Sequence, residues 1–154
     1  MSPTVGPRFA PPVPEGYALL TGFEQEIAKA ISLTIFPEGG EIGPSGEDVG
    51  VSRFFDRYLA EIPPLMRTGL RVFLIVLEFL PFLFIFKLSR FSRLNASDRE
   101  RYLEAWYDHR FFWMRAAMLA LKSICSLCYY ADERVREELG FYVVCVDGKR
   151  RQDI

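Results

Sequence analysis

Histidine is almost absent from this sequence, cysteines are few, and neither sign of charge is in excess. The single histidine, His109, leaves little room for metal centres or catalytic triads, since both commonly depend on imidazole groups. Three cysteines, an odd number, do not indicate a disulfide framework. Nineteen Lys and Arg against twenty Asp and Glu give a formal net charge of −1, so no overall positive field attracts nucleic acid.

We also expect no export signal. Residues 1–17, MSPTVGPRFAPPVPEGY, contain neither an apolar segment behind a basic one nor a pair of adjacent arginines. We therefore expect a protein that is cytoplasmic or bound peripherally to the inner face of the cytoplasmic membrane.

Aromatic residues and prolines are, by contrast, plentiful. Fourteen Phe, seven Tyr and two Trp indicate either an aromatic-rich core or apolar surface reserved for a partner or for lipid. Half of the 154 residues are apolar, which suits one folded domain. Because five of the ten prolines fall in the first sixteen residues, we expect a Pro-rich flexible arm over 1–20. A helical accessory domain is expected over 21–141 and a short extended, β-like tail over 142–154.

Periodic apolar residues predict an all-α fold, a small bundle of about five helices. Thr21 and Glu24 have the spacing of a capping box, and behind them isoleucines recur every four residues until Pro37. Residues 38–50 contain five glycines and are expected to form a loop. A second helix is expected over about residues 48–62, before a pair of prolines.

A longer helical pattern occupies the second half of the chain. Ser97 and Glu100 have the spacing of another capping box, and the apolar periodicity behind them extends over more than 30 residues. That length exceeds an ordinary globular helix, so we expect a break near residues 108–110. Asp132 is expected to cap a short last helix, which Gly140 would end.

The longest apolar run, VFLIVLEFLPFLFIF, covers residues 72–86 and is interrupted by Glu78 and Pro81. Fifteen residues of helix cover about 22 Å, against about 30 Å of bilayer hydrocarbon, which disfavours a clean transmembrane span. Three arrangements remain open. The segment is buried in the bundle or under a partner, it dips into one membrane leaflet with nearby Lys and Arg at the headgroups, or it spans the membrane. Glu78 argues against the last of these.

Polar residues in apolar surroundings are the candidates for chemistry. Cys125 and Cys128 form a C-x-x-C pair deep in an apolar helical pattern, and we interpret them as buried structural cysteines; a thiol redox protein is the weakest hypothesis. His109 is interpreted as a structural histidine at a helix break. Glu78 is expected to pair with a nearby Arg or with polar groups of a partner, a proton-handling carboxylate being the alternative. No catalytic, cofactor-binding or metal-binding residue is assigned.

Three segments together resemble a known family. They are ISLTIFP at 31–37, GEDVGVSRFFDRYLAEIPPLMRTGLR at 46–71, and FSRLNASDRERYLEAWYDHRFFWMRAAMLALKSICSLCYYADERVREELGF at 91–141. This order of helix-face residues resembles the gluconate 2-dehydrogenase third-subunit family, small helical companions of GMC-type flavin oxidoreductases. It is also similar to the helical N-terminal region of long-chain alcohol oxidases. The resemblance covers roughly residues 23–141 and contains no catalytic motif.

The resemblance implies a partner. It implies a non-catalytic accessory subunit that stabilises or escorts a large, separate FAD-dependent flavoprotein, which would oxidise an alcohol, sugar, sterol or other lipophilic hydroxyl compound. FAD would belong to that partner and no cofactor to this chain. Many such small subunits carry a twin-arginine signal, and its absence here favours a cytoplasmic or inner-membrane-face complex.

Partner or membrane contact is expected through residues 72–86. On that hypothesis a set of apolar residues lies at the contact surface, with two arginines at its rim: Phe73, Leu77, Phe82, Phe84, Phe86, Arg90 and Arg93. The alternative function is a stand-alone peripheral membrane protein that binds lipid without an enzyme partner.

Overall fold

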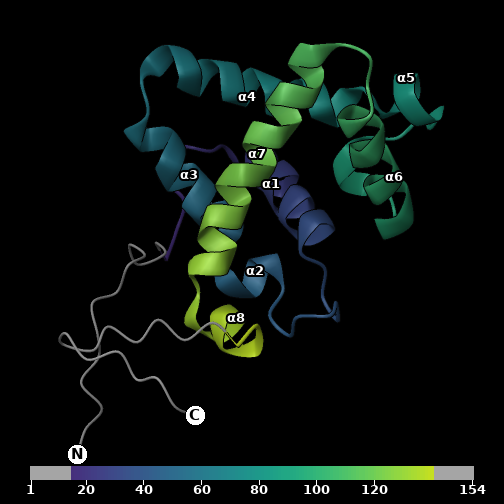
Figure 1. Ribbon diagram of the computed structural model, residues 1–154. Coiled ribbons are helices and arrows are strands. Elements are labelled where there is room, and N and C mark those ends of the chain that lie inside the picture. The colour runs from purple at the N-terminus through teal and green to yellow at the C-terminus, as the bar shows by residue number, and fades with distance from the viewer. Residues whose placement is uncertain (1–14, 141–154) are drawn as a thin grey trace, which may run out of the picture.

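The computed structural model describes residues 15–140, which fold into helices without a strand (Figure 1). The expected all-α class is therefore confirmed. Within this range there are eight α-helices and one 3-10 helix, more than the five or so expected. They are α1 (Gly22–Ile35), α2 (Gly46–Val49), α3 (Val51–Glu61), α4 (Pro64–Phe79), α5 (Pro81–Ile85), η1 (Phe91–Arg93), α6 (Ala96–Tyr107), α7 (Phe112–Ala131) and α8 (Glu133–Glu138). The expected β-like tail and most of the Pro-rich arm lie outside the described residues.

Capping side chains start the first two helices. Before α1 the Thr21 N–H donates to the Glu24 carboxylate at 2.9 Å and the Glu24 N–H donates to the Thr21 hydroxyl at 3.4 Å, so the predicted capping box is confirmed. Ser45 and Asp48 form a second capping box, which starts α2. The prediction of a loop throughout residues 38–50 is therefore wrong at its end. Gly50, at a φ of 84° that few other residues adopt, turns the chain from α2 into α3.

The second half of the chain largely follows the predicted pattern. Helix α6 is capped by Asn95, whose side chain accepts from the Asp98 N–H at 2.8 Å, so the helix begins before the expected cap at Ser97. The expected break lies between α6 and α7, at residues 108–111. Asp132 caps α8 as predicted, and Gly140, with φ 72°, follows its end.

The apolar run is divided by Pro81 rather than forming one helix. Pro64 takes the first position of α4, where its fixed φ suits a helix start, and α4 then continues to Phe79. Pro81 has no N–H to donate to the Leu77 carbonyl, and the Tyr102 hydroxyl donates to that oxygen instead, at 2.8 Å. Among the described residues, none of the helices has the length and hydropathy needed to cross a membrane.

The helices pack around α1 and α7. Helix α7 crosses the middle of the molecule and packs against α3 and α6, while α1 lies against α2, α3 and α4 (Figure 1). The largest fully buried side chains are Trp106 and Tyr102 on α6 and Phe91 on η1, and rings from α4 and α5 pack on Trp106. The aromatic residues that are plentiful in the sequence thus fill one part of the core.

Buried carboxylates fasten segments that are far apart in the chain. The Arg71 guanidinium on α4 donates twice to the Glu24 carboxylate on α1, at 2.7 and 2.9 Å. The Asp56 carboxylate on α3 accepts from the consecutive N–H groups of Ala18, Leu19 and Leu20, at 2.6 to 2.9 Å. Since each carboxylate is paired, its burial is compensated, and these contacts hold α1 and the segment before it against α3 and α4.

Candidate functional site

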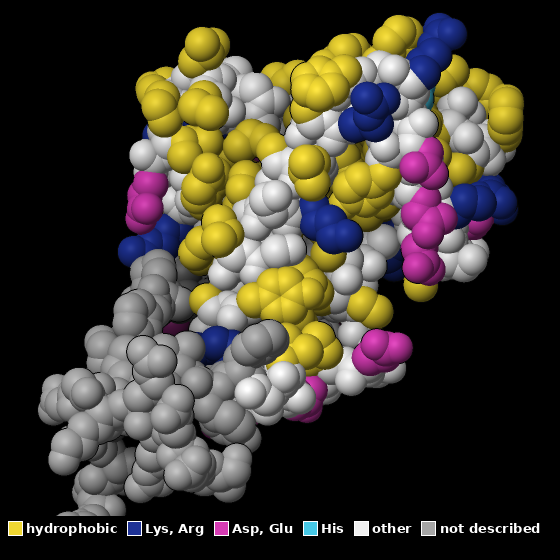
Figure 2. Space-filling view, viewed as in Figure 1, with side chains coloured by type: hydrophobic (Ala, Val, Ile, Leu, Met, Phe, Trp, Pro, Cys, Tyr) yellow, Lys and Arg dark blue, Asp and Glu magenta, His cyan; other side chains and the backbone are white. Residues whose placement is uncertain are grey.

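Large apolar side chains that face solvent are concentrated in two segments of the described chain. Of seventeen such side chains, sixteen lie in residues 62–97 or 109–131, and the other is Leu139. Figure 2 shows them as yellow side chains over α4, over the N-terminal end of α7 and over α5, along the upper part of the view. Large contiguous apolar patches are uncommon on monomers, so these side chains are the candidates for a contact surface.

The outer side of α4 is the first of three apolar surfaces. Its side chains recur at the spacing of one helical stripe, and the opposite stripe, which includes Leu74 and Leu77, is fully buried in the core. Helix α4 is therefore apolar on both sides. We call the exposed stripe the α4 face, formed by Leu65, Met66, Val72, Ile75, Val76 and Phe79.

The second surface lies at α5 and the residues after it. Phe86 is 84% exposed and Leu88 is 92% exposed, and Lys87 stands between them. Phe86 also has a φ of 55°, a left-handed conformation that bulky residues rarely adopt. We call this surface the α5 tip, formed by Phe82, Leu83, Phe86, Lys87 and Leu88.

The third surface runs along α7 and was not predicted from the sequence. It begins with an aromatic cluster at the start of the helix, where the Arg110 guanidinium lies 4.8 Å from the Phe111 ring centre and that of Arg115 lies 6.0 Å from the ring of Phe112. The sequence did contain a pattern that indicates this surface, because apolar residues also occur at positions of α7 outside its buried stripe, which includes Met114, Met118 and Leu121. We call it the α7 face, formed by Phe111, Phe112, Trp113, Leu119, Leu127 and Tyr130.

The predicted contact residues divide between surface and core. Phe82, Phe86 and Arg93 are exposed, and Arg90 is half-buried with its guanidinium 5.9 Å from the Phe23 ring. Leu77 is fully buried, so its assignment to a contact surface is wrong. The reason is that its stripe of α4 is the one that faces the core.

Phe73 and Phe84 were also expected at the contact surface, but both pack on the aromatic core. The Phe73 ring meets Trp106 edge-on at 5.4 Å, and the Phe84 ring stacks on Trp106 at 5.0 Å. Each is half-buried. The break at Pro81 turns α5 against α6, and the Phe84 side chain is thereby placed inward.

Glu78 has a structural partner that the sequence analysis did not identify. It is fully buried, and its carboxylate accepts from the Ser92 hydroxyl at 2.6 Å and the Ser92 N–H at 3.0 Å. The expected pairing with an arginine is therefore wrong. These bonds fasten η1 to α4, which fixes the chain that follows the α5 tip.

The sulfur and imidazole groups match their structural interpretation. Burial raises the pKa of the Cys125 and Cys128 thiols to about 12 each, so both thiols are protonated near neutral pH and are poor nucleophiles. His109 accepts from the Phe111 N–H at 3.2 Å at the break between α6 and α7, with its ring 5.4 Å from that of Phe84.

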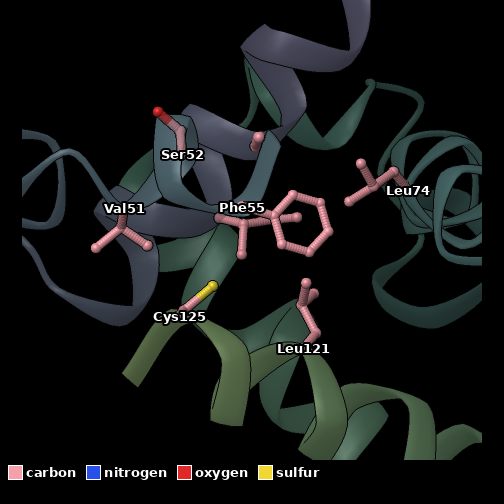
Figure 3. A pocket seen from close by; sticks show the side chains of 8 residues that line it. Val51, Ser52, Phe55, Leu74, Leu121 and Cys125 are labelled. Carbon is pink, nitrogen blue, oxygen red and sulfur yellow. The ribbon is translucent and has the colours of Figure 1, made fainter. Parts of the chain in front are cut away.

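A small pocket lies between α1, α3, α4 and α7 (Figure 3). Its lining is apolar apart from Ser52, whose hydroxyl is bonded to Tyr17 and Glu47. The pocket contains no space wide enough for a water molecule. The described residues also contain no group of three His, Cys, Asp or Glu that could hold a metal ion.

Comparison of this chain with protein-family models, with curated proteins and with solved structures gave no match. The family resemblance therefore stays a prediction from the residues that carry it.

Proposed function

We propose that this protein is a non-catalytic accessory subunit whose α7 face binds a separate, FAD-dependent oxidoreductase of the GMC type. The partner is named from the family resemblance, and its substrate would be an alcohol, sugar or sterol. The α7 face is the observation that carries the proposal. No residue of this chain is assigned to the flavin, which belongs to the partner.

The α7 face has the composition of a protein–protein interface. Trp, Tyr, Phe and Arg are the residues enriched at such interfaces and at their energetic hot spots. Here Phe112 and Trp113 are exposed beside Arg110 and Arg115. The six side chains of the α7 face expose about 700 Å², if a large side chain presents roughly 150–250 Å². One partner in a stable complex commonly contributes about 800 Å².

The charge around the α7 face indicates what its partner presents. Residues 109–131 contain Arg110, Arg115 and Lys122 but no Asp or Glu. A complementary surface is therefore apolar with carboxylates at its rim, because opposite charges at a rim speed and orient association.

A pull-down from the native host tests the proposal. We expect the tagged chain, captured in mild detergent, to bring down a chain of several hundred residues with flavin absorbance and alcohol-dependent dye reduction. With a Trp113→Ser, Leu127→Ser variant, the amount of flavin recovered should fall at least tenfold, since hot-spot truncations cost about 2 kcal/mol or more each.

Leu139→Ser is the matched control, because Leu139 is exposed but lies on none of the three surfaces. It should retain the flavoprotein. A colourless eluate from the wild-type chain, or equal flavin recovery with the Trp113 and Leu127 variant, would contradict the proposal.

A further inference from the structure

The segment that forms the α4 face and the α5 tip contains far more basic than acidic residues. Residues 62–97 contain five Lys and Arg and a single carboxylate, although the whole chain has a net charge of −1. That carboxylate is Glu78, which is fully buried and bonded to Ser92. The solvent-facing charges of this segment are therefore all positive, and they accompany its exposed apolar side chains.

Two exposed cations lie in or soon after the α5 tip in the sequence. Lys87 stands between Phe86 and Leu88, and Arg93 is exposed on η1. The Asp98 carboxylate on α6 lies 3.5 Å from Lys87 and 3.6 Å from Arg101, so this acid is shared by two cations. Helix α6, which packs against α5, also carries Glu100 and Glu104, so the excess of positive charge belongs to residues 62–97 themselves.

The α5 tip projects from the molecule rather than forming a hollow. Figure 1 shows α5 at an outer corner, where it packs against α4 and α6. Phe86 and Leu88 are almost fully exposed, and the Phe86 backbone has the strained left-handed conformation. Strained residues that gain no packing from their own chain point to a function.

A convex apolar tip with adjacent cations suits a fluid surface better than a protein pocket. A bilayer needs no matching shape, it accepts Phe and Leu at the acyl boundary, and its anionic headgroups attract Lys and Arg. Lysine can keep its ammonium at headgroup level while its stem lies along apolar groups. The α4 face continues the same upper edge of the molecule (Figure 2).

We propose that the α5 tip, continued by the α4 face, docks this protein onto membranes containing anionic phospholipid. Phe86 and Leu88 enter the acyl boundary, and Lys87 and Arg93 lie among the headgroups. This docking does not depend on the flavoprotein partner, whose surface is the α7 face.

Vesicle flotation of the full chain without any partner tests this inference. We expect the protein to float with vesicles of an equal mixture of phosphatidylcholine and phosphatidylglycerol, and to stay at the bottom of the gradient with phosphatidylcholine alone. A Phe86→Gly, Leu88→Ser variant should lower the partition coefficient at least about tenfold, since two large apolar groups no longer leave water. Lys87→Gln with Arg93→Gln should lower it by about fivefold per cation removed.

Two controls separate docking from folding and from partner binding. Both side chains of the apolar variant are exposed and glycine relaxes the φ of residue 86, so its urea midpoint should not fall. Trp113→Ser with Leu127→Ser should float like wild type. Failure of the wild-type chain to float with the mixed vesicles, equal flotation with phosphatidylcholine alone, or undiminished flotation of the apolar variant would each overturn the inference.

Discussion

Helices α3 and α4 follow each other in the chain and pack on the same helix, yet their outer sides differ. Helix α3 buries Val51, Phe55 and Leu59, and on its solvent side Arg57 and Glu61 form an ion pair at 3.0 Å. That is the pattern of an ordinary surface helix. Helix α4 buries one apolar stripe and exposes a second one. Among the described residues the second stripe adds nothing to the core, and it is the surface that we propose contacts a membrane.

The largest expected effect is the difference in stability between substitutions on the two sides of α4. Leu77→Ala should lower the free energy of unfolding by about 3 kcal/mol, because it removes a fully buried side chain and leaves a cavity. Val72→Ala, on the exposed α4 face, should change it by less than about 0.5 kcal/mol. Urea denaturation of both variants measures the difference. Equal losses would mean that the α4 face is covered within the chain and that the comparison with α3 is wrong.

A second comparison is between two ion pairs: the Glu24–Arg71 pair, which joins α1 to α4, and the exposed Arg57–Glu61 pair of α3. Glu24→Gln should cost about 2 kcal/mol at neutral pH, since Arg71 then loses the partner of two short bonds beside the core. Glu61→Gln, in the exposed pair of α3, should cost less than about 0.5 kcal/mol. A Glu24→Gln cost as small as that of Glu61→Gln would contradict the structural role of the α4 pair.

The same pair makes the effect of Glu24 depend on pH. Hydrogen bonds from Arg71 hold the pKa of the Glu24 carboxyl below its ordinary value of 4.5. The contribution of the Glu24 carboxylate to the free energy of unfolding is therefore complete above pH 4.5. It is lost as the pH falls below that value through the lower pKa of the folded state. Wild type and Glu24→Gln should approach each other in stability only at acid pH. Urea midpoints measured across this range check the sign.

The smallest expected effect concerns the α5 tip. Phe86→Gly should raise the free energy of unfolding by about 0.5–1 kcal/mol, because glycine adopts a φ of 55° without strain and the lost ring is 84% exposed. Thermal unfolding measures this gain, and Leu83→Gly, at a helical position with ordinary φ, is the destabilising control. A destabilised Phe86→Gly protein would show that the ring packs within the chain.

Features that depend on neighbours within a few residues were predictable. The capping box of Thr21 and Glu24 and the cap of α8 by Asp132 follow from side chains that bond their own local backbone. The stop after α8 follows from Gly140, which adopts a positive φ readily, and the break near residue 109 from the length of the helical pattern. The helical class follows from apolar periodicity. The burial of Cys125 and Cys128 was predictable too, because both positions belong to the buried stripe of α7.

Features that depend on distant partners were not predictable. The bonds of Glu78 to Ser92 and of Glu24 to Arg71 join residues 14 and 47 positions apart. Nothing in the local pattern selects these partners, since any nearby donor would satisfy a buried carboxylate.

By itself, the sequence determined that this protein is helical, where many of its helices begin and end, and that it carries more apolar surface than its core requires. The tertiary structure alone decided which apolar residues are the surplus ones. Periodicity shows that Leu77 and Val76 lie on different sides of α4, but both sides are apolar, so hydrophobicity cannot tell which one faces the core. Packing against α1 and η1, and the turn at Pro81, make that choice.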